Sequence, residues 1–109
     1  AYYSKPSARE WFVDSFDRLH PNALDGIKIT QFHSRTNSTK QFELSARRAE
    51  WLDGHWWLFD AAILPYSPRG IPMSRKPGPV AGSALGTMFL DFTETPADFL
   101  REIKPWGNF

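Results

Sequence analysis

FELSARRAEWLDGHWWL, residues 42–58, is the stretch that decides the fold of this chain. At its centre stands Asp53-Gly54, the pair preferred in a two-residue type I′ turn, because both central residues of that turn need positive φ. Before the turn, Phe42, Leu44 and Ala46 alternate with polar residues, which is the pattern of a half-buried strand. The segment therefore predicts a β-hairpin.

The alternation of apolar and polar residues is imperfect on both sides of that turn. Arg48 breaks the parity before Ala49 and Trp51, which indicates a β-bulge. The strand expected to return over residues 55–64 is apolar on both faces around residues 56–59. At least one of its Trp rings is therefore expected on a partly exposed face.

Further strands are expected before the hairpin. Residues 11–17 mix aromatic and polar positions and end at the turn-forming residues 20–22. Residues 24–32 place Ile27 and Ile29 on one face of a strand, with polar residues on the other. These segments extend the hairpin into a sheet.

The composition of the chain changes after the hairpin. Residues 65–82 hold five of the nine prolines and three of the seven glycines, which excludes a central strand or a helix and predicts a long irregular connection. Residues 87–92 offer one more strand. A helix then follows, because Thr95 can cap it, Asp98 can complete a capping box, and the apolar residues within 99–103 form one stripe.

Composition limits the functions that the chain can serve. A length of 109 residues fits a single domain with one core. The formal net charge of +1 is too small to attract nucleic acid or an anionic membrane by charge alone. The absence of cysteine excludes a disulfide, a thiolate nucleophile and a zinc–thiolate site. Because no stretch approaches the roughly 18 apolar residues of a membrane span, the domain itself is expected to be soluble.

The residues that often carry catalysis lack the patterns that catalysis needs. His20, His33 and His55 do not have metal-ligand spacing, so no metal site and no cofactor is predicted. No G-x-S-x-G motif is present, which argues against serine hydrolysis. We therefore expect a protein that is not an enzyme.

Two alternatives remain open from the residues alone. Two of Asp14, Asp17 and Asp60 could serve as the acid and base of a sugar-active enzyme, which needs two carboxylates facing one cleft. A carbohydrate- or small-ligand-binding module would instead need exposed rings, such as those of Trp51 and Trp57, aligned on one surface. Neither alternative has a motif behind it.

Basic residues outnumber acidic ones in the middle of the chain. If they form a binding patch, Arg47 and Arg48 beside Trp51 are its expected centre, because arginine binds phosphate through paired hydrogen bonds and stacks on rings. Stacking of single-stranded nucleic acid on the aromatic residues is disfavoured by the near-neutral total charge. Arg47 and Arg48 are thus candidates for phosphate contact, and no nucleic-acid partner is predicted.

Four segments in order along the chain carry a resemblance to a known family. They are REWFVDSFDR (9–18), LDGIKITQF (24–32), FELSARRAEWLDGHWWL (42–58) and FLDFTETPADFLREIKP (89–105). Together they resemble the periplasmic domain of the LptF/LptG (YjgP/YjgQ) lipopolysaccharide-export permeases. The likeness implies that residues 1–109 are one periplasmic domain cut from a larger membrane permease.

This resemblance implies a fold, a function and a set of partners. The fold would be mostly β, a single β-jellyroll-like domain of two sheets with one short C-terminal α-helix. The domain would lie at the periplasmic face of the inner membrane of a Gram-negative bacterium and pass lipopolysaccharide from the permease toward the periplasmic jellyroll bridge. Its partners would be lipopolysaccharide, the sister permease subunit and jellyroll proteins of the LptC/LptA type. Transport would be driven by ATP hydrolysis on a separate ATPase subunit, reached through membrane helices.

Strand parity selects the residues that would face the interior of such a domain and contact lipid. They are Ile27, Ile29, Phe42, Leu44, Ala46, Trp56, Leu58 and Phe89. An open-ended β fold with apolar residues inside can shelter acyl chains. The competing interpretation is that the same residues simply pack a core, as aromatic clusters usually do.

Overall fold

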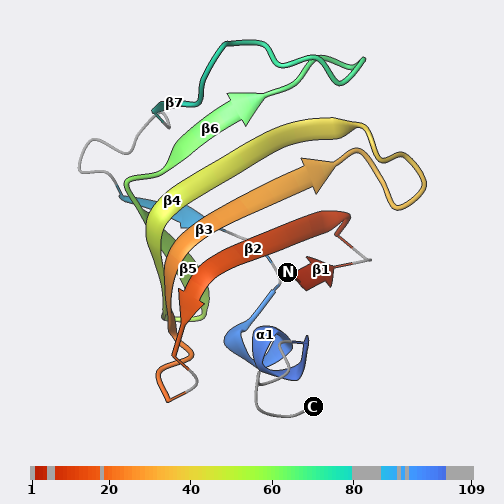
Figure 1. Ribbon diagram of the computed structural model, residues 1–109. Coiled ribbons are helices and arrows are strands. Elements are labelled where there is room, and N and C mark those ends of the chain that lie inside the picture. Colours follow the sequence, from red (N-terminus) through yellow and green to blue (C-terminus); the bar gives the residue numbers. More distant parts are fainter. Residues whose placement is uncertain are drawn as a thin grey trace.

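A computed structural model of the chain describes residues 2–4, 7–17, 19–79, 87–90, 92 and 94–102 (Figure 1). At residues 79, 87–90 and 100–102 it describes the backbone alone. The elements are β1 Tyr2–Ser4, β2 Arg9–Phe16, β3 Ala23–Phe32, β4 Lys40–Leu52, β5 His55–Phe59, β6 Ala62–Pro65, β7 Gly78–Pro79, β8 Thr87–Leu90 and α1 Pro96–Glu102. The chain is thus mostly β with one short C-terminal helix in the described part, as predicted.

The strands form one antiparallel sheet that divides at β4. Neighbours follow the order β1-β2-β3-β4-β5-β8, in which β5 pairs with the second half of β4. The first half of β4 pairs with β6 instead, and β6 pairs with β7. One sheet whose two halves share β4 therefore takes the place of the two sheets expected (Figure 1).

The turn between β4 and β5 has the predicted geometry. Leu52 lies opposite His55, and φ is positive at both residues between them, 53° at Asp53 and 77° at Gly54. Positive φ at both central positions is the requirement of a type I′ turn. The β-hairpin inferred from Asp53-Gly54 is confirmed.

The two halves of the sheet meet along a line of four residues, which we call the fold line. It consists of Asp14, Gly26, Arg47 and Asp60, the positions that the pairing of neighbouring strands skips while the residues on either side remain paired. The backbone has positive φ at two of them, 68° at Gly26 and 56° at Asp60. β2, β3 and β4 each curve along their length, which gives the sheet its curl (Figure 1).

The fold line corrects two predictions. The parity slip at Arg48 is not a β-bulge, because the register between β3 and β4 runs through that position unbroken, and the shift in this pair lies between Gln31 and Phe32. The strand predicted over residues 55–64 is interrupted at Asp60 and continues as β6. In both places a bend shared by neighbouring strands changes which side chains face inward.

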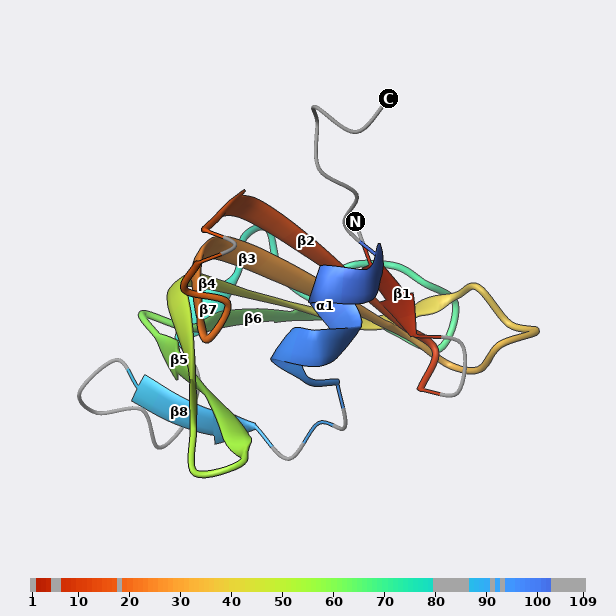
Figure 2. The ribbon, with the colours of Figure 1, turned by 90° about the horizontal axis from the view of Figure 1, so that it is seen from below.

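The helix closes the concave side of the curled sheet (Figure 2). Phe99 of α1 is fully buried, with ring centroids 4.9 Å from Trp11 and 5.6 Å from Trp56. The capping box forms as predicted, since the Thr95 N–H donates to Asp98 Oδ2 at 2.8 Å. A residue from near the C-terminal end of the described chain thus completes the core of the sheet.

The proline-rich connection has no central strand or helix in its described part. Between β6 and β7 it contains one isolated bridge, which joins Tyr66 and Pro72. Residues 80–82 of the predicted connection lie outside the described residues. Among the described residues, no helix has both the length and the apolar character that crossing a membrane requires.

Candidate functional site

The concave face of the sheet is the candidate functional site, because most of the predicted interior residues meet there. Ile27, Ile29, Leu44, Ala46, Trp56 and Leu58 are all buried in one hydrophobic cluster. Phe42 is partly buried against this cluster. Phe89 lies opposite Trp57 on β8, and its side chain is outside the described part of the structure. The inward orientation follows strand parity, while contact with lipid stays a prediction.

Sequence reasoning missed three large side chains of the same cluster. Trp11, Leu24 and Phe99 are each fully buried there. Trp11 and Leu24 stand in segments that were expected to be strands, and Phe99 belongs to the apolar stripe of the helix. Local periodicity could have placed each of them inside, but it could not show that all three meet.

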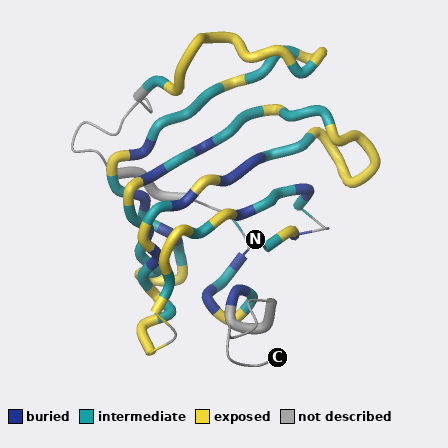
Figure 3. Tube along the Cα trace, in the orientation of Figure 1, coloured by how far each residue is buried: buried dark blue, intermediate teal, exposed yellow. Residues whose placement is uncertain are grey.

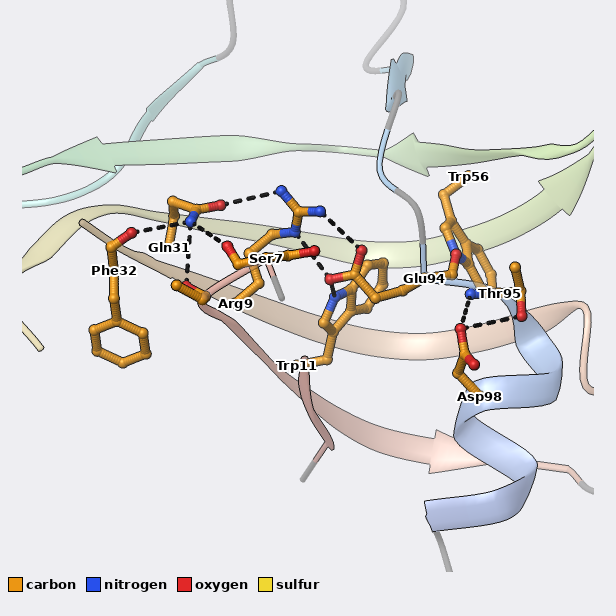
Figure 4. Close-up of polar contacts among 10 residues, drawn as sticks. Ser7, Arg9, Trp11, Gln31, Phe32, Trp56, Glu94, Thr95 and Asp98 are labelled. Carbon is orange, nitrogen blue, oxygen red and sulfur yellow. Dashed lines mark hydrogen bonds and ion pairs between the residues drawn. The ribbon is translucent and has the colours of Figure 1, made fainter. Parts of the chain in front are cut away.

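A buried carboxylate fixes the segment before α1 to the sheet (Figure 4). Glu94 is 2% exposed, and its Oε2 accepts hydrogen bonds from Arg9 Nε at 2.9 Å and from Trp11 Nε1 at 3.0 Å. Arg9 Nη2 donates to Oε1 at 3.0 Å. The backbone carbonyl of Glu94 accepts from Trp56 Nε1 at 2.9 Å. Both the side chain and the backbone of Glu94 therefore bind residues of the sheet.

Arg9 is held from several directions in this arrangement. Its Nη1 donates to Gln31 Oε1 at 3.2 Å, and its guanidinium lies 3.9 Å from the ring centroid of Phe92. The Gln31 amide nitrogen in turn donates to the Ser7 carbonyl at 2.9 Å. No buried side-chain nitrogen or oxygen among the described residues is left without a partner. Such a network stabilises one arrangement of charges and penalises the loss of any member.

No sequence signal pointed to this network. Arg9 and Glu94 are 85 positions apart, and each stands in an ordinary polar context. Charged residues are seldom fully buried unless they are paired, so Glu94 alone would be taken for a surface residue. Only the tertiary fold brings the two side chains together.

The two arginines proposed to contact phosphate are engaged in ion pairs. Arg47 Nε lies 2.7 Å from Asp60 Oδ2. Arg48 contacts two acids, Asp25 at 2.9 Å and Glu50 at 2.8 Å. A phosphate would have to compete with carboxylates that already neutralise both guanidinium groups, so phosphate contact here stays a prediction without geometric support.

The carboxylates and histidines do not converge on one cleft. Asp14 lines a pocket together with Gly26 and Arg47, but neither Asp17 nor Asp60 is among the residues that line it, whereas a glycosidase needs two carboxylates in one cleft. His20 lies 2.9 Å from Asp17, and the hydrogen bonds from His20 and the Leu19 N–H lower the pKa of that carboxyl. Among the described residues, no three His, Cys, Asp or Glu side chains are grouped to hold a metal.

The sugar platform suggested by two Trp residues does not form. Trp51 lies opposite Trp56, and their ring centroids are 5.2 Å apart on the inner side of the sheet. Trp57 follows Trp56 directly, so its side chain points to the opposite face, and its Nε1 donates to the Leu52 carbonyl at 3.3 Å. Trp51 and Trp57 therefore do not share a surface.

No protein-family model matches this chain, and no curated protein matches it significantly.

Proposed function

We propose that this domain is a non-catalytic, lipid-handling part of a lipopolysaccharide exporter of the LptF/LptG type. The observation that carries the proposal is the concave face, where aliphatic and aromatic side chains from β2, β3, β4 and β5 form one continuous buried cluster. Such a face, curled around an apolar interior, offers acyl chains the environment that they lack in water. Each methylene that enters it would contribute about 0.8 kcal/mol.

In this proposal, α1 covers the concave face when no lipid is bound, and lipid displaces it. Phe99 occupies the space between Trp11 and Trp56, which is a position that an acyl chain could fill equally well. Glu94 is bonded to the sheet independently of Phe99, through Arg9, Trp11 and Trp56. On this proposal, the helix moves away from the concave face while the hydrogen bonds of Glu94 keep the segment before it attached to the sheet.

Edge strands supply the proposed contacts with other jellyroll proteins. β1 pairs with β2 only at residues 9–11, so residues 12–16 of β2 have no second partner strand among the described residues. An unpaired strand edge can accept a strand from another chain. In the exporter this neighbour would be the sister permease subunit or a protein of the LptC/LptA type, at the periplasmic face of the inner membrane.

Photocrosslinking from two phenylalanine positions tests the proposal. Phe42 on β4 faces the interior, whereas Phe12 on β2 is 46% exposed and is not part of the buried cluster. We would replace each in turn with p-benzoylphenylalanine in the 109-residue chain and irradiate it with lipopolysaccharide. Both sites carry a ring in the native protein, so each serves as a matched control for the other.

Adducts are expected from position 42 and not from position 12. Replacing Phe99 with Ala should increase the yield at position 42, because the cover then loses its main apolar contact. Equal yields from both positions, or adducts from position 12 alone, would show that the concave face does not take acyl chains. The domain would then be a docking module and not part of the lipid path.

A further inference from the structure

The segment between β6 and β7 combines exposed positive charge with exposed apolar side chains. We call residues 67–77 the cationic loop. It carries Arg69, Arg75 and Lys76, and the sequence has no Asp or Glu from residue 61 to residue 90. Ile71 and Met73, in the same loop, are 60% and 66% exposed. The loop stands at the outer edge of the molecule, away from α1 (Figure 3).

Hydrogen bonds hold the cationic loop in a defined shape. The Ser67 N–H donates to the Ile71 carbonyl and the Gly70 N–H donates to the Ser67 carbonyl, both at 2.8 Å. The Met73 N–H donates to the Pro65 carbonyl at 2.9 Å. Binding to a loop that is already ordered loses less conformational entropy than binding to a disordered one.

The positive charge of this loop is not neutralised within the described part of the chain. None of its three cationic side chains takes part in the ion pairs found there. The acid that reaches the start of the loop, Glu43, contacts Tyr66 and is already paired with Lys28 and Lys40. The cationic loop thus differs from Arg47 and Arg48, which are both paired with carboxylates.

The cationic loop begins beside the rim of the concave face. Pro65, just before it, lies opposite Phe42, and the Tyr66 N–H donates to the Gln41 carbonyl at 3.0 Å. A ligand whose apolar part reached Phe42 would therefore hold its polar part close to the loop. Such a ligand would carry an anionic group next to acyl chains, and a phosphorylated lipid has this combination.

We infer that the cationic loop binds the phosphate groups of the lipopolysaccharide headgroup while the acyl chains occupy the concave face. This inference rests on the proposed function and adds an orientation to it. Arginine and lysine supply the charge that phosphate requires. Ile71 and Met73 supply apolar contacts for the chains that leave the headgroup.

A charge-removal experiment tests the inference. The double variant Arg75→Gln, Lys76→Gln removes two cations of the loop. Its control, Lys28→Gln, Arg35→Gln, removes two cations outside the loop with the same change in net charge. Affinity would be measured for bisphosphorylated lipid A and for an analogue with hydroxyls in place of both phosphates. The loop variant should bind the phosphorylated lipid about 30-fold more weakly, because each cation contributes roughly fivefold, and it should lose its preference over the analogue. The control variant should keep that preference.

The outcomes separate this inference from the proposed function. If photocrosslinking at Phe42 persists but the loop variant keeps its preference for the phosphorylated lipid, the inference is wrong and the proposed function stands. If crosslinking at Phe42 fails, the proposed function is wrong, and the inference that depends on it falls as well. Loop-dependent binding to phosphatidylglycerol vesicles without binding to lipid A would also overturn it, because the loop would then dock on an anionic bilayer.

Discussion

Arg9–Glu94 and Arg47–Asp60 are both arginine–carboxylate pairs, with Nε–oxygen distances of 2.9 Å and 2.7 Å. They differ in their surroundings. The side chains of the first pair are 14% and 1% exposed, and those of the second are 69% and 61% exposed. The shorter contact is therefore the one in water, where solvent screens the attraction and competes for the same hydrogen bonds.

The difference predicts that burial, and not the length of the contact, decides how much an ion pair contributes to the fold. Glu94 connects the segment before α1 to β2, two parts of the chain that are 85 positions apart, and it cannot exchange its partners for water. Asp60 connects neighbouring positions of one curled sheet and can be hydrated if its partner is lost. Breaking the first pair from one side is therefore expected to be costly, while breaking the second should have little effect.

The largest effect is expected when the buried pair is broken from one side. Glu94→Gln keeps an acceptor for Trp11 but leaves the Arg9 guanidinium without its carboxylate. Breaking a buried pair in this way destabilises a protein by about 3–5 kcal/mol. The free energy of unfolding, measured by urea denaturation, should fall by that amount.

A double-mutant cycle checks that the loss comes from the pair itself. Arg9→Met with Glu94→Gln removes both charges, so the double variant should be less destabilised than the sum of the two single variants by about 2 kcal/mol. If the losses in the free energy of unfolding were additive, Arg9 and Glu94 would act separately. The buried contact would then contribute no more to stability than the exposed one.

The fold line should depend on its backbone more than on its ion pair. A Cβ on Gly26 would lie 2.3 Å from Asp14 Oδ2, and φ at Gly26 is 68°. Gly26→Ala should therefore lower the free energy of unfolding by about 1–3 kcal/mol, more than either partner of the Arg47–Asp60 pair. Ala at Gly54, where nothing lies within 4 Å of the Cβ position, is the control for positive φ without a clash. If Gly26→Ala and Gly54→Ala lower the free energy of unfolding by the same amount, the clash with Asp14 contributes nothing to the loss.

Glu43 lies between the two pairs in burial and should show an intermediate effect. Burial disfavours its charged form, but hydrogen bonds from Tyr66 and then from Lys28 and Lys40 outweigh it and lower its pKa below the usual 4.5. Because the folded-state pKa is the lower one, ionised Glu43 stabilises the fold above about pH 4.5 and loses this contribution as the pH falls.

Unfolding measured from pH 7 to pH 3 tests this linkage. Glu43→Gln should be less stable than the native protein at pH 7, by about 1 kcal/mol, and the two should converge as the pH falls below 4.5. A constant difference across that range would show that Glu43 acts through packing and not through its charge.

Local patterns predicted the parts of this fold that depend on neighbours in sequence. The Asp53-Gly54 turn and the helix cap at Thr95 formed as expected because each is determined by a few adjacent residues. Period-two alternation also predicted the burial of Ile27, Ile29, Leu44 and Ala46. It did not predict the burial of Leu24, nor that of Thr30, which it assigned to the polar face of β3. The slip at Arg48 was visible as well, but it was assigned to the wrong cause.

The parts that failed are those in which distant segments decide the outcome. The bend at Arg47, next to the slip at Arg48, is shared with Gly26 and Asp60, and the sequence of one strand does not indicate where its neighbouring strands bend. The same holds for Glu94, whose burial follows from Arg9 and two Trp residues on other strands. The inward-facing residues of the candidate site were therefore predictable from the sequence. The position of α1 over these residues and the attachment of Glu94 to the sheet were not.

The smallest effect is expected at the exposed pair. Asp60→Asn removes the charge that faces Arg47 but can retain a hydrogen bond, and both side chains already contact solvent. Asn also tolerates the positive φ of 56° that Asp60 adopts, so the backbone is not disturbed. The free energy of unfolding should change by less than about 0.5 kcal/mol, and added salt should not alter this result.

A loss at Asp60→Asn that approached the loss at Glu94→Gln would overturn the comparison. It would mean that the Arg47–Asp60 contact holds the two halves of the sheet together at the fold line, where β5 gives way to β6. Asp60→Ala, which lacks the tolerance of Asn for positive φ, separates the two explanations. If Ala is costly while Asn is not, position 60 matters for its backbone conformation, and its ion pair contributes little to the fold.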